Sequence, residues 1–307
     1  MLTYAIKRLL GAVPTLFIIV TVAFFMIRMA PGGPFALERP LPQSIMDNLQ
    51  AIYHLDEPLV VQYLLYLKNL LAGNLGPSMV YRDFSVAEII GNGLPVSIQF
   101  GGSAILIALG VGALMGSIAA LRQNSRTDYS IMGVAMIGIT IPNFVMAPVL
   151  SLVLGVYLGW LPAGGWGEGA IENKILPIVT LALPQLAVIA RLTRGSMIEV
   201  LRSNHIRTAR AKGLPEWLVL RRHALRAALL PVVSYLGPAT AALLTGSVVI
   251  ETIFGVPGVG RYFVQGALNR DYTLVMGTVV LIASFIVLFN LVVDLIYGWL
   301  DPKVRYD

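Results

Sequence analysis

Long apolar runs, separated by shorter polar segments, dominate the chain. Six runs are candidates for membrane-spanning helices, because a helix that crosses a bilayer needs about 20 mostly apolar residues. The fourth run reaches that length only if it continues through Arg191 toward Gly195, with Arg191 and Arg194 extending toward the headgroups. The pattern predicts an all-α integral membrane protein with six transmembrane helices, at residues 9–30, 96–121, 130–157, 176–189, 229–250 and 274–297.

The composition supports this class. Only 12% of the residues are charged and 57% are hydrophobic, and the mean hydropathy is +0.78. A soluble protein usually carries about 25% charged residues. These values exclude a soluble globular domain and a disordered chain. The absence of cysteine also excludes disulfides and thiolate chemistry.

The basic residues are distributed unevenly along the predicted topology. If the N-terminus is cytoplasmic, 15 of the 22 Lys and Arg residues lie on the cytoplasmic side and six lie outside, with Arg28 at the outer end of the first span. This bias follows the positive-inside rule and places both termini in the cytoplasm. Topology therefore explains the pI of about 9.6, and we expect no nucleic-acid partner.

Two polar segments are long enough to form structure of their own. The first includes a predicted amphipathic helix that begins after Pro58 and stops at Gly73. We expect it to pack on the outer mouth of the bundle, with a membrane-surface helix as the alternative. We divide the chain into residues 1–95, the first span plus an extracytoplasmic helical segment, and residues 96–307, a five-helix core with a cytoplasmic segment at 191–228.

The cytoplasmic segment carries nine basic residues between positions 191 and 226. Helix-forming residues continue to Lys212, Gly213 is a helix stop, and Pro215 and Glu216 begin a second helix that runs through His223. The prediction is a helix, a tight turn and a second helix. Composition alone leaves two interpretations open: a protrusion that another protein grips, or a loop whose charges only set topology.

Chemistry within the chain is disfavoured. No glycine precedes a lysine, so the G-x-x-x-x-G-K-[ST] phosphate loop is absent, and residues 255–260 are interpreted as a turn. Arg28 and Glu251 lie at the outer ends of predicted spans and Asp294 lies near an inner end, so a proton relay is not indicated. A self-sufficient secondary transporter and an intramembrane enzyme are therefore the weaker alternatives, and energy for uphill transport would enter from a partner.

Several motifs carry a family resemblance over nearly the whole chain. Ile206-Arg-Thr-Ala-Arg-Ala-Lys-Gly-Leu214, followed by His223-Ala-Leu-Arg226, resembles the cytoplasmic EAA-type signature of ABC importer permeases of the peptide type. The chain is most similar to the B-type permease subunits of oligopeptide importers. It departs from the broad signature because Arg207-Thr208-Ala209 stands where Glu-Ala-Ala is usual, a substitution that peptide-type permeases share.

The resemblance implies a type I importer fold in the bacterial cytoplasmic (inner) membrane, with the chain as a multi-pass permease for oligopeptides; dipeptides, nickel and glutathione are alternative substrates. Expected partners are a second homologous permease, two cytoplasmic ABC ATPases, an extracytoplasmic peptide-binding protein and membrane lipid. ATP and Mg would be bound by the ATPases, with no cofactor in this chain. The implied ATPase-coupling residues are Arg207, Thr208, Ala209, Arg210, Ala211, Lys212, Gly213, Leu214 and His223.

A path for a polar peptide should be hydrated and lined by uncharged polar side chains. An equally good interpretation is that such side chains hold helices together by hydrogen bonds. Pro142, Pro184 and Pro238 are candidates for bends in the spans. The path candidates are Gln99, Thr140, Asn143, Gln185 and Thr245.

Overall fold

The chain is built from helices. The computed structural model describes residues 2–29, 53–81, 83–244 and 248–300, and side chains from Leu10 to Ile296 within them. Five of its helical stretches are long and apolar enough to cross a membrane, and a bent pair of helices brings the number to six. This confirms the predicted class. The five are α1 (Leu2–Met29), α4 (Val86–Leu121), α7 (Ile171–Leu201), α11 (Leu230–Leu244) with α12 (Val248–Ile253), and α14 (Tyr272–Leu300).

The third apolar run is bent at Pro142, one of the prolines that the sequence suggested as a site of bending. It consists of α5 (Arg126–Thr140) and α6 (Asn143–Leu150), which continues as the π-helix η1 (Ser151–Tyr157), and the two parts meet at 104°. Ile141 is extended and Pro142 precedes α6. Proline has no N–H and disfavours the helical region for the residue before it, so a helix rarely continues through this dipeptide.

Helices α4 and α7 extend well beyond their apolar runs. Helix α4 begins at Val86 rather than at residue 96, because Ser85 and Glu88 form a reciprocal capping box that starts the helix in a polar stretch. Helix α7 begins at Ile171, five residues before the predicted start. At its other end α7 continues past Arg191 and Arg194 to Leu201, which removes the doubt about whether this run can span a membrane.

Glycines allow the backbones of α4 and α7 to touch. A Cβ atom built on Gly116 would lie 2.4 Å from the carbonyl oxygen of Ala190, and one on Gly112 would lie 2.9 Å from that of Leu186. Real side chains do not approach this closely, so only glycine fits. Small residues at such crossings are the usual basis of helix association in membranes. The two helices therefore form the centre of the bundle.

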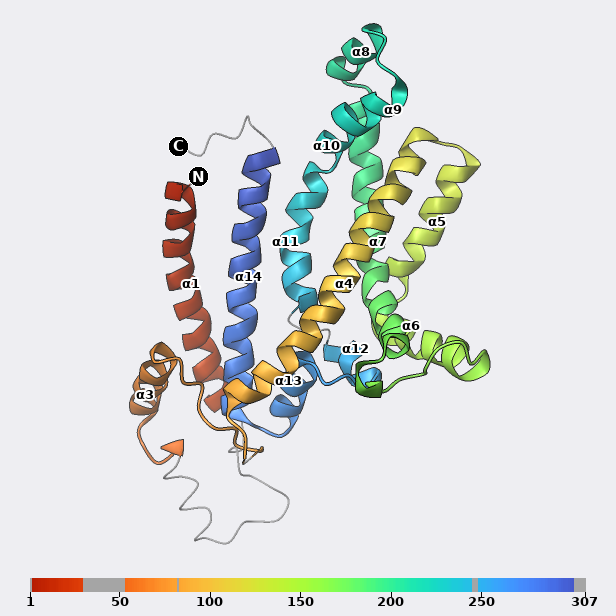
Figure 1. Cartoon of the computed structure of the whole chain (residues 1–307). Coiled ribbons are helices and arrows are strands. Elements are labelled where there is room, and N and C mark those ends of the chain that lie inside the picture. The colour runs from red at the N-terminus through yellow and green to blue at the C-terminus, as the bar shows by residue number, and fades with distance from the viewer. Residues whose placement is uncertain (1, 30–52, 82, 245–247, 301–307) are drawn as a thin grey trace.

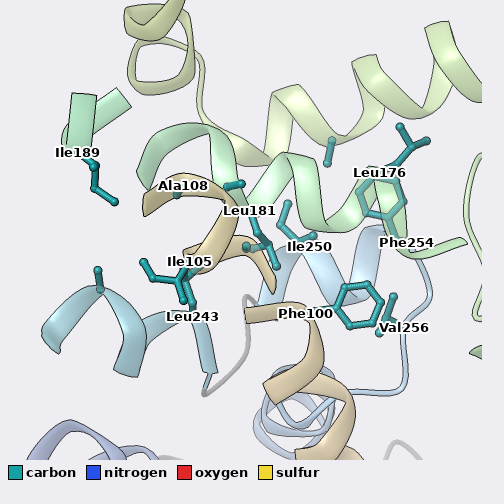
Figure 2. Packing of buried hydrophobic residues seen from close by; sticks show 14 of the residues in the cluster. Phe100, Ile105, Ala108, Leu176, Leu181, Ile189, Leu243, Ile250, Phe254 and Val256 are labelled. Carbon is teal, nitrogen blue, oxygen red and sulfur yellow. The ribbon is translucent and has the colours of Figure 1, made fainter. Parts of the chain in front are cut away.

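The main apolar core lies around this crossing. Figure 2 shows buried side chains from α4, α7, α11 and α12 pointing toward one another, with Phe254 and Val256 closing the cluster from the turn after α12. Phe100 and Leu176 are 2% and 1% exposed. Labelled members of the cluster are Phe100, Ile105, Ala108, Leu176, Leu181, Ile189, Leu243, Ile250, Phe254 and Val256.

The short elements gather at the two ends of the bundle (Figure 1). At one end, α8 (Asn204–Ala211) and α9 (Glu216–Leu218) protrude, followed by the π-helix η3 (Val219–Ala224) and α10 (Leu225–Ala228). The first turn of α1 and the last turn of α14 lie toward the same end (Figure 1). At the opposite end lie α3 (Leu59–Leu71), the 3-10 helix η2 (Gly167–Gly169) and α13 (Val259–Leu268).

The predicted amphipathic helix after Pro58 is α3, and it ends before Gly73 as expected, where φ is +74°. Its Tyr63 and Tyr66 side chains pack against a cluster centred on Phe24 of α1. The interpretation that this helix packs on the bundle is confirmed. The predicted turn at 255–260 is confirmed for residues 255–258, which connect α12 to α13, whereas Val259 and Gly260 already belong to α13.

Candidate functional site

Helix α8 is an exposed, amphipathic helix that packs on the bundle through two buried side chains, Ile206 and Ala209. Ile206 is 0% exposed and Ala209 is 5% exposed, and both pack in a cluster with Met197 of α7 and with Val219 and Ala224 of η3. The remaining residues of α8 are exposed. The helix therefore presents one face to the bundle and the other face to the surroundings.

Helices α7 and α8 are separated by a break at Arg202 and Ser203. Arg202 ends α7, and Ser203 has the extended conformation of a helix N-cap. The Ser203 hydroxyl donates to the carbonyl of Val200 at 2.6 Å and lies 2.9 Å from Nδ1 of His205. Serine favours such positions because its side chain competes for backbone hydrogen bonds. Our prediction of a helix running up to Lys212 did not include this break.

Gly213 ends α8 in the way the sequence predicted. Its φ is +77°, and its N–H donates to the carbonyl of Arg210 at 2.9 Å. A Cβ atom at this position would meet nothing within 4 Å. The left-handed backbone therefore favours glycine here, and the empty space around it contradicts the alternative that Gly213 only permits close packing within the chain.

An ion pair closes the turn. The Arg210 guanidinium donates twice to the Glu216 carboxylate, with Nη2 2.5 Å from Oε1 and Nε 3.1 Å from Oε2. The hydrogen bonds from Arg210 lower the pKa of the Glu216 carboxyl below its ordinary value. Both side chains are exposed, at 44% and 53%, so the pair orients the turn more than it stabilises it.

The remaining predicted coupling residues lie where the sequence placed them. Arg207, Thr208, Ala211 and Lys212 are on the exposed surface of α8 and its cap, and Leu214 is half-buried. His223 is half-buried on η3, the segment against which α8 packs. Eight of the nine residues therefore lie on α8 and the turn after it, and His223 lies on the neighbouring η3.

The path candidates are more scattered. Gln99 is exposed on α4, Thr140 is exposed at the last residue of α5, and Asn143 is half-buried at the first residue of α6. The Tyr235 hydroxyl of α11 donates to the side chain of Gln185 on α7. Gln185 therefore acts as a link between helices, which was the alternative interpretation. Thr245 lies outside the described residues.

Sequence reasoning missed a buried ion pair close to α8. Arg194 of α7 donates to both carboxylate oxygens of Asp128 on α5, each at 2.6 Å, and Asp128 is 1% exposed. We had expected Arg194 to reach the headgroups. The two residues are 66 positions apart, so the available signal was limited to Ser125, whose hydroxyl accepts from the Asp128 N–H and starts α5.

Glu251 is also bound locally. It is 3% exposed, and its carboxylate accepts from the Ser97 hydroxyl of α4 at 2.7 Å and from the Arg261 N–H of α13 at 3.1 Å. A Cβ on Gly258 would collide with this carboxylate at 2.4 Å, and one on Gly260 would lie 3.0 Å from its Oε2 and 2.9 Å from the backbone of Val248. The glycine-containing turn therefore wraps around a structural acid. Within the described part of the chain, no group of three or more His, Asp or Glu residues is placed to hold a metal ion.

Two family models match the chain, and they identify its class. Residues 112–306 match the binding-protein-dependent transport system inner membrane component, and residues 1–84 match the N-terminal part of the membrane component of such systems. The chain belongs to this family. It is a multi-pass membrane component of an ABC importer, a class that works with a substrate-binding protein and an ATPase.

Relatives of known name match over the full length. The oligopeptide transport system permease protein OppB of Escherichia coli is 53% identical over 306 residues, which cover 100% of both chains. The protein of the same name from Haemophilus influenzae is also 53% identical with the same coverage. The dipeptide transport system permease protein DppB of Bacillus subtilis is 44% identical over 305 residues, covering 99% of this chain and 98% of that one.

Solved structures share the fold at low identity. The inward-facing MetNI methionine ABC transporter matches with a TM-score of 0.56 and 17% identity, covering 69% of this chain and 96% of that one. An amino acid ABC transporter crystallised with histidines matches with a TM-score of 0.51 and 15% identity, covering 71% and 95%. These likenesses support the predicted type I importer architecture.

Proposed function

We propose that this chain is the permease subunit through which an ABC importer moves oligopeptides into the cytoplasm. The support is the 53% identity that extends over the whole of both chains to permeases named for oligopeptides, against 44% to one named for dipeptides. Identity spread over the whole length favours a shared task over a shared fold alone. Competition between tetrapeptides and dipeptides for uptake by the assembled transporter tests this assignment.

The proposed assembly contains a second homologous permease, two cytoplasmic ATPases and an extracytoplasmic peptide-binding protein. ATP and Mg would be bound by the ATPases, because this chain has no glycine-rich phosphate loop. Basic residues concentrated at the α8 end support a cytoplasmic position for that end. Purification in mild detergent followed by subunit identification tests the composition.

In this proposal α8 is the coupling helix, and it inserts into a cleft of the ATPase. The observation that carries the assignment is its geometry. Ile206 and Ala209 hold the helix on the bundle, while Arg207, Arg210 and Lys212 project from its free side. Figure 1 shows α8 at the tip of the molecule, beyond the ends of the spans. A short helix so placed can be moved by a partner without unfolding the membrane core.

The turn after α8 gives a sharp test. Replacing Gly213 with Val forces a β-branched residue into φ near +77°, whereas Asn tolerates that region. Neither side chain meets an obstacle, because the space around the Cβ position is empty. We expect G213V to lose most peptide uptake at normal membrane abundance, and G213N to retain most of it.

The measurement is uptake of labelled peptide into vesicles that contain the whole transporter, beside the amount of permease in the membrane. Normal uptake by G213V would remove the coupling role from this turn. Equal loss in G213V and G213N would show that any side chain is harmful there, which contradicts the backbone argument.

A further inference from the structure

A small cavity with a mixed polar and apolar lining lies at the end of the bundle opposite α8, outside the coupling segment and the apolar core. Its volume is about 110 Å³, and it lies between the end of α1, helix α3, the loop at residues 74–79 and the first turn of α14. This volume suits one small polar group and not a peptide. The polar side chains lining it include Arg28, His54, Gln62, Tyr66, Asn69 and Asn74.

Arg28 is held in a fixed orientation beside the cavity. Its Nε donates to Oε1 of Gln62 at 2.8 Å, and its guanidinium lies 3.7 Å from the centre of the Phe24 ring. Gln62 is 7% exposed, and its amide donates to the carbonyls of Leu55 and Glu57. A buried amide that is bonded on both sides cannot rotate freely, so it fixes the direction in which Arg28 presents its remaining N–H groups.

No carboxylate of the described residues pairs with Arg28. Asp271, close to the cavity wall at Thr273, is fully engaged: one oxygen accepts from the Ser78 hydroxyl, and the other accepts from Thr273 and from the Leu274 N–H. A guanidinium removed from water normally has an anionic partner. The aromatic ring below it compensates for only part of the lost hydration.

Tyr66 provides a second, independent sign of a missing ligand. Its hydroxyl is buried and makes no hydrogen bond to any residue that the structure describes. Buried hydroxyls are nearly always bonded, because leaving one unbonded costs free energy. Burial raises the pKa of this hydroxyl to about 12, so it remains a hydrogen-bond donor.

We propose that this cavity binds a single phosphate group through the guanidinium of Arg28, and that the Tyr66 hydroxyl, which is covered in the unliganded structure, turns toward the phosphate as a second donor. Arginine favours phosphate because its planar fork can donate two parallel bonds. Arg28 is the next-to-last residue of the span Leu10–Met29, which places it at the depth of the headgroups. The phosphate comes from a phospholipid headgroup or is free inorganic phosphate. This inference does not depend on the transported substrate.

Three variants separate binding from folding. Arg28→Gln removes the charge. Tyr66→Phe removes only a hydroxyl that has no protein partner, so the unliganded protein should be as stable as wild type. Lys68→Gln is the matched control, because it removes an exposed positive charge from α3, the helix of Tyr66, at a residue that does not line the cavity.

The full chain in detergent is tested in two arms. One arm measures the thermal unfolding midpoint against inorganic phosphate, with chloride at matched ionic strength. The other measures phospholipid retained in native mass spectrometry. We expect Arg28→Gln to weaken phosphate or phospholipid binding about tenfold or more, Tyr66→Phe about two- to tenfold, and Lys68→Gln to behave as wild type.

The two arms distinguish the sources. A midpoint raised by free phosphate in wild type, and lost in Tyr66→Phe, supports a site for the free ion. Phospholipid retained by wild type and lost by the same variant, with no effect of free phosphate, supports a headgroup site. Binding in neither arm, or equal binding by wild type, Arg28→Gln and Tyr66→Phe, would overturn the proposal.

Discussion

The attachment of α8 depends mainly on one side chain, and this makes Ile206→Ala the most informative perturbation. Ile206 is fully buried among residues of α7 and η3, and the second contact, Ala209, contributes only a methyl group. An isolated helix of eight residues is not stable in water, because nucleation costs more than so few hydrogen bonds return. Helix α8 therefore exists because it is packed.

The magnitude follows from the size of the lost contact. Truncating a buried Ile to Ala costs about 2–5 kcal/mol, with the larger values at sites that cannot collapse. If the cost falls on the attachment of α8 alone, the open population rises about 30-fold to several-thousand-fold. The spans do not depend on this contact, so membrane insertion should be unchanged.

Hydrogen exchange measured on the assembled transporter reports the opening directly. We expect the amides of residues 204–212 to exchange faster in Ile206→Ala by the factor given above, while the amides of α4 and α7 keep their protection. Peptide uptake should fall together with that protection. Ala211→Ser is the control, since Ala211 is exposed on the same helix and its replacement leaves the buried contact intact.

If the Ile206→Ala variant exchanged its amides at residues 204–212 as slowly as the wild type, the reasoning would be refuted. Such a result would show that α8 is held by something other than its buried face. Faster exchange with normal uptake would keep the packing argument but would remove the requirement for a fixed α8 in coupling.

Two further predictions concern the membrane core. Asp128→Asn should lower the free energy of unfolding by about 1–3 kcal/mol, which is less than for a fully buried pair because the Arg194 side chain is 27% exposed. Thermal unfolding in detergent at low and high salt measures this loss, and wild-type stability of the variant at both salts would contradict the prediction. Gly101→Ala should lower stability by about 1–3 kcal/mol through overpacking, and membrane abundance with it, because its Cβ would lie 2.4 Å from the Leu243 carbonyl oxygen. Gly102→Ala is the control and should be close to neutral, because the nearest atom to its Cβ is 3.9 Å away. Equal effects of the two variants would contradict this packing.

The features that the sequence predicted correctly are local ones. Apolar runs located the spans because burial in lipid requires a continuous stretch of apolar residues. The stop at Gly213 and the restart at Pro215 were predictable because the backbone conformations of glycine and proline depend little on the rest of the fold. Helix α3 was predictable for the same reason, from Pro58 and Gly73.

The lengths and shapes of the spans were less predictable. Helix α4 extends ten residues beyond its apolar run because a capping box, and not hydrophobicity, sets its start. The bend before α6 has a visible cause in Pro142, yet the 104° angle depends on how α5 and η1 pack and cannot be read from the dipeptide. Hydropathy therefore underestimates helix length wherever polar residues continue a helix beyond the bilayer.

Pairs distant in sequence were not predictable at all. Asp128 meets Arg194 across 66 residues, and Glu251 meets Ser97 across 154. Each residue alone suggested a simpler role, at a span end or on a loop, because one sequence contains no information about which helix faces land together. The same limit applies to Gln185, whose partner lies 50 residues away on another helix.

Backbone contacts determine how a displacement of α8 would reach the membrane. Helix α7 is continuous for 31 residues from the membrane to the serine that precedes α8. Gly116 and Gly138 bring α4 and α5 against it so closely that no side chain fits between, with Cβ positions 2.4 Å from carbonyl oxygens of α7. Closely packed interiors have low compressibility, so helices in such contact move together. The Asp128–Arg194 pair adds a link at the α8 end. A force on α8 is therefore expected to move α4, α5 and α7 as one body, because neither α4 nor α5 can slide away from α7 without first separating these contacts.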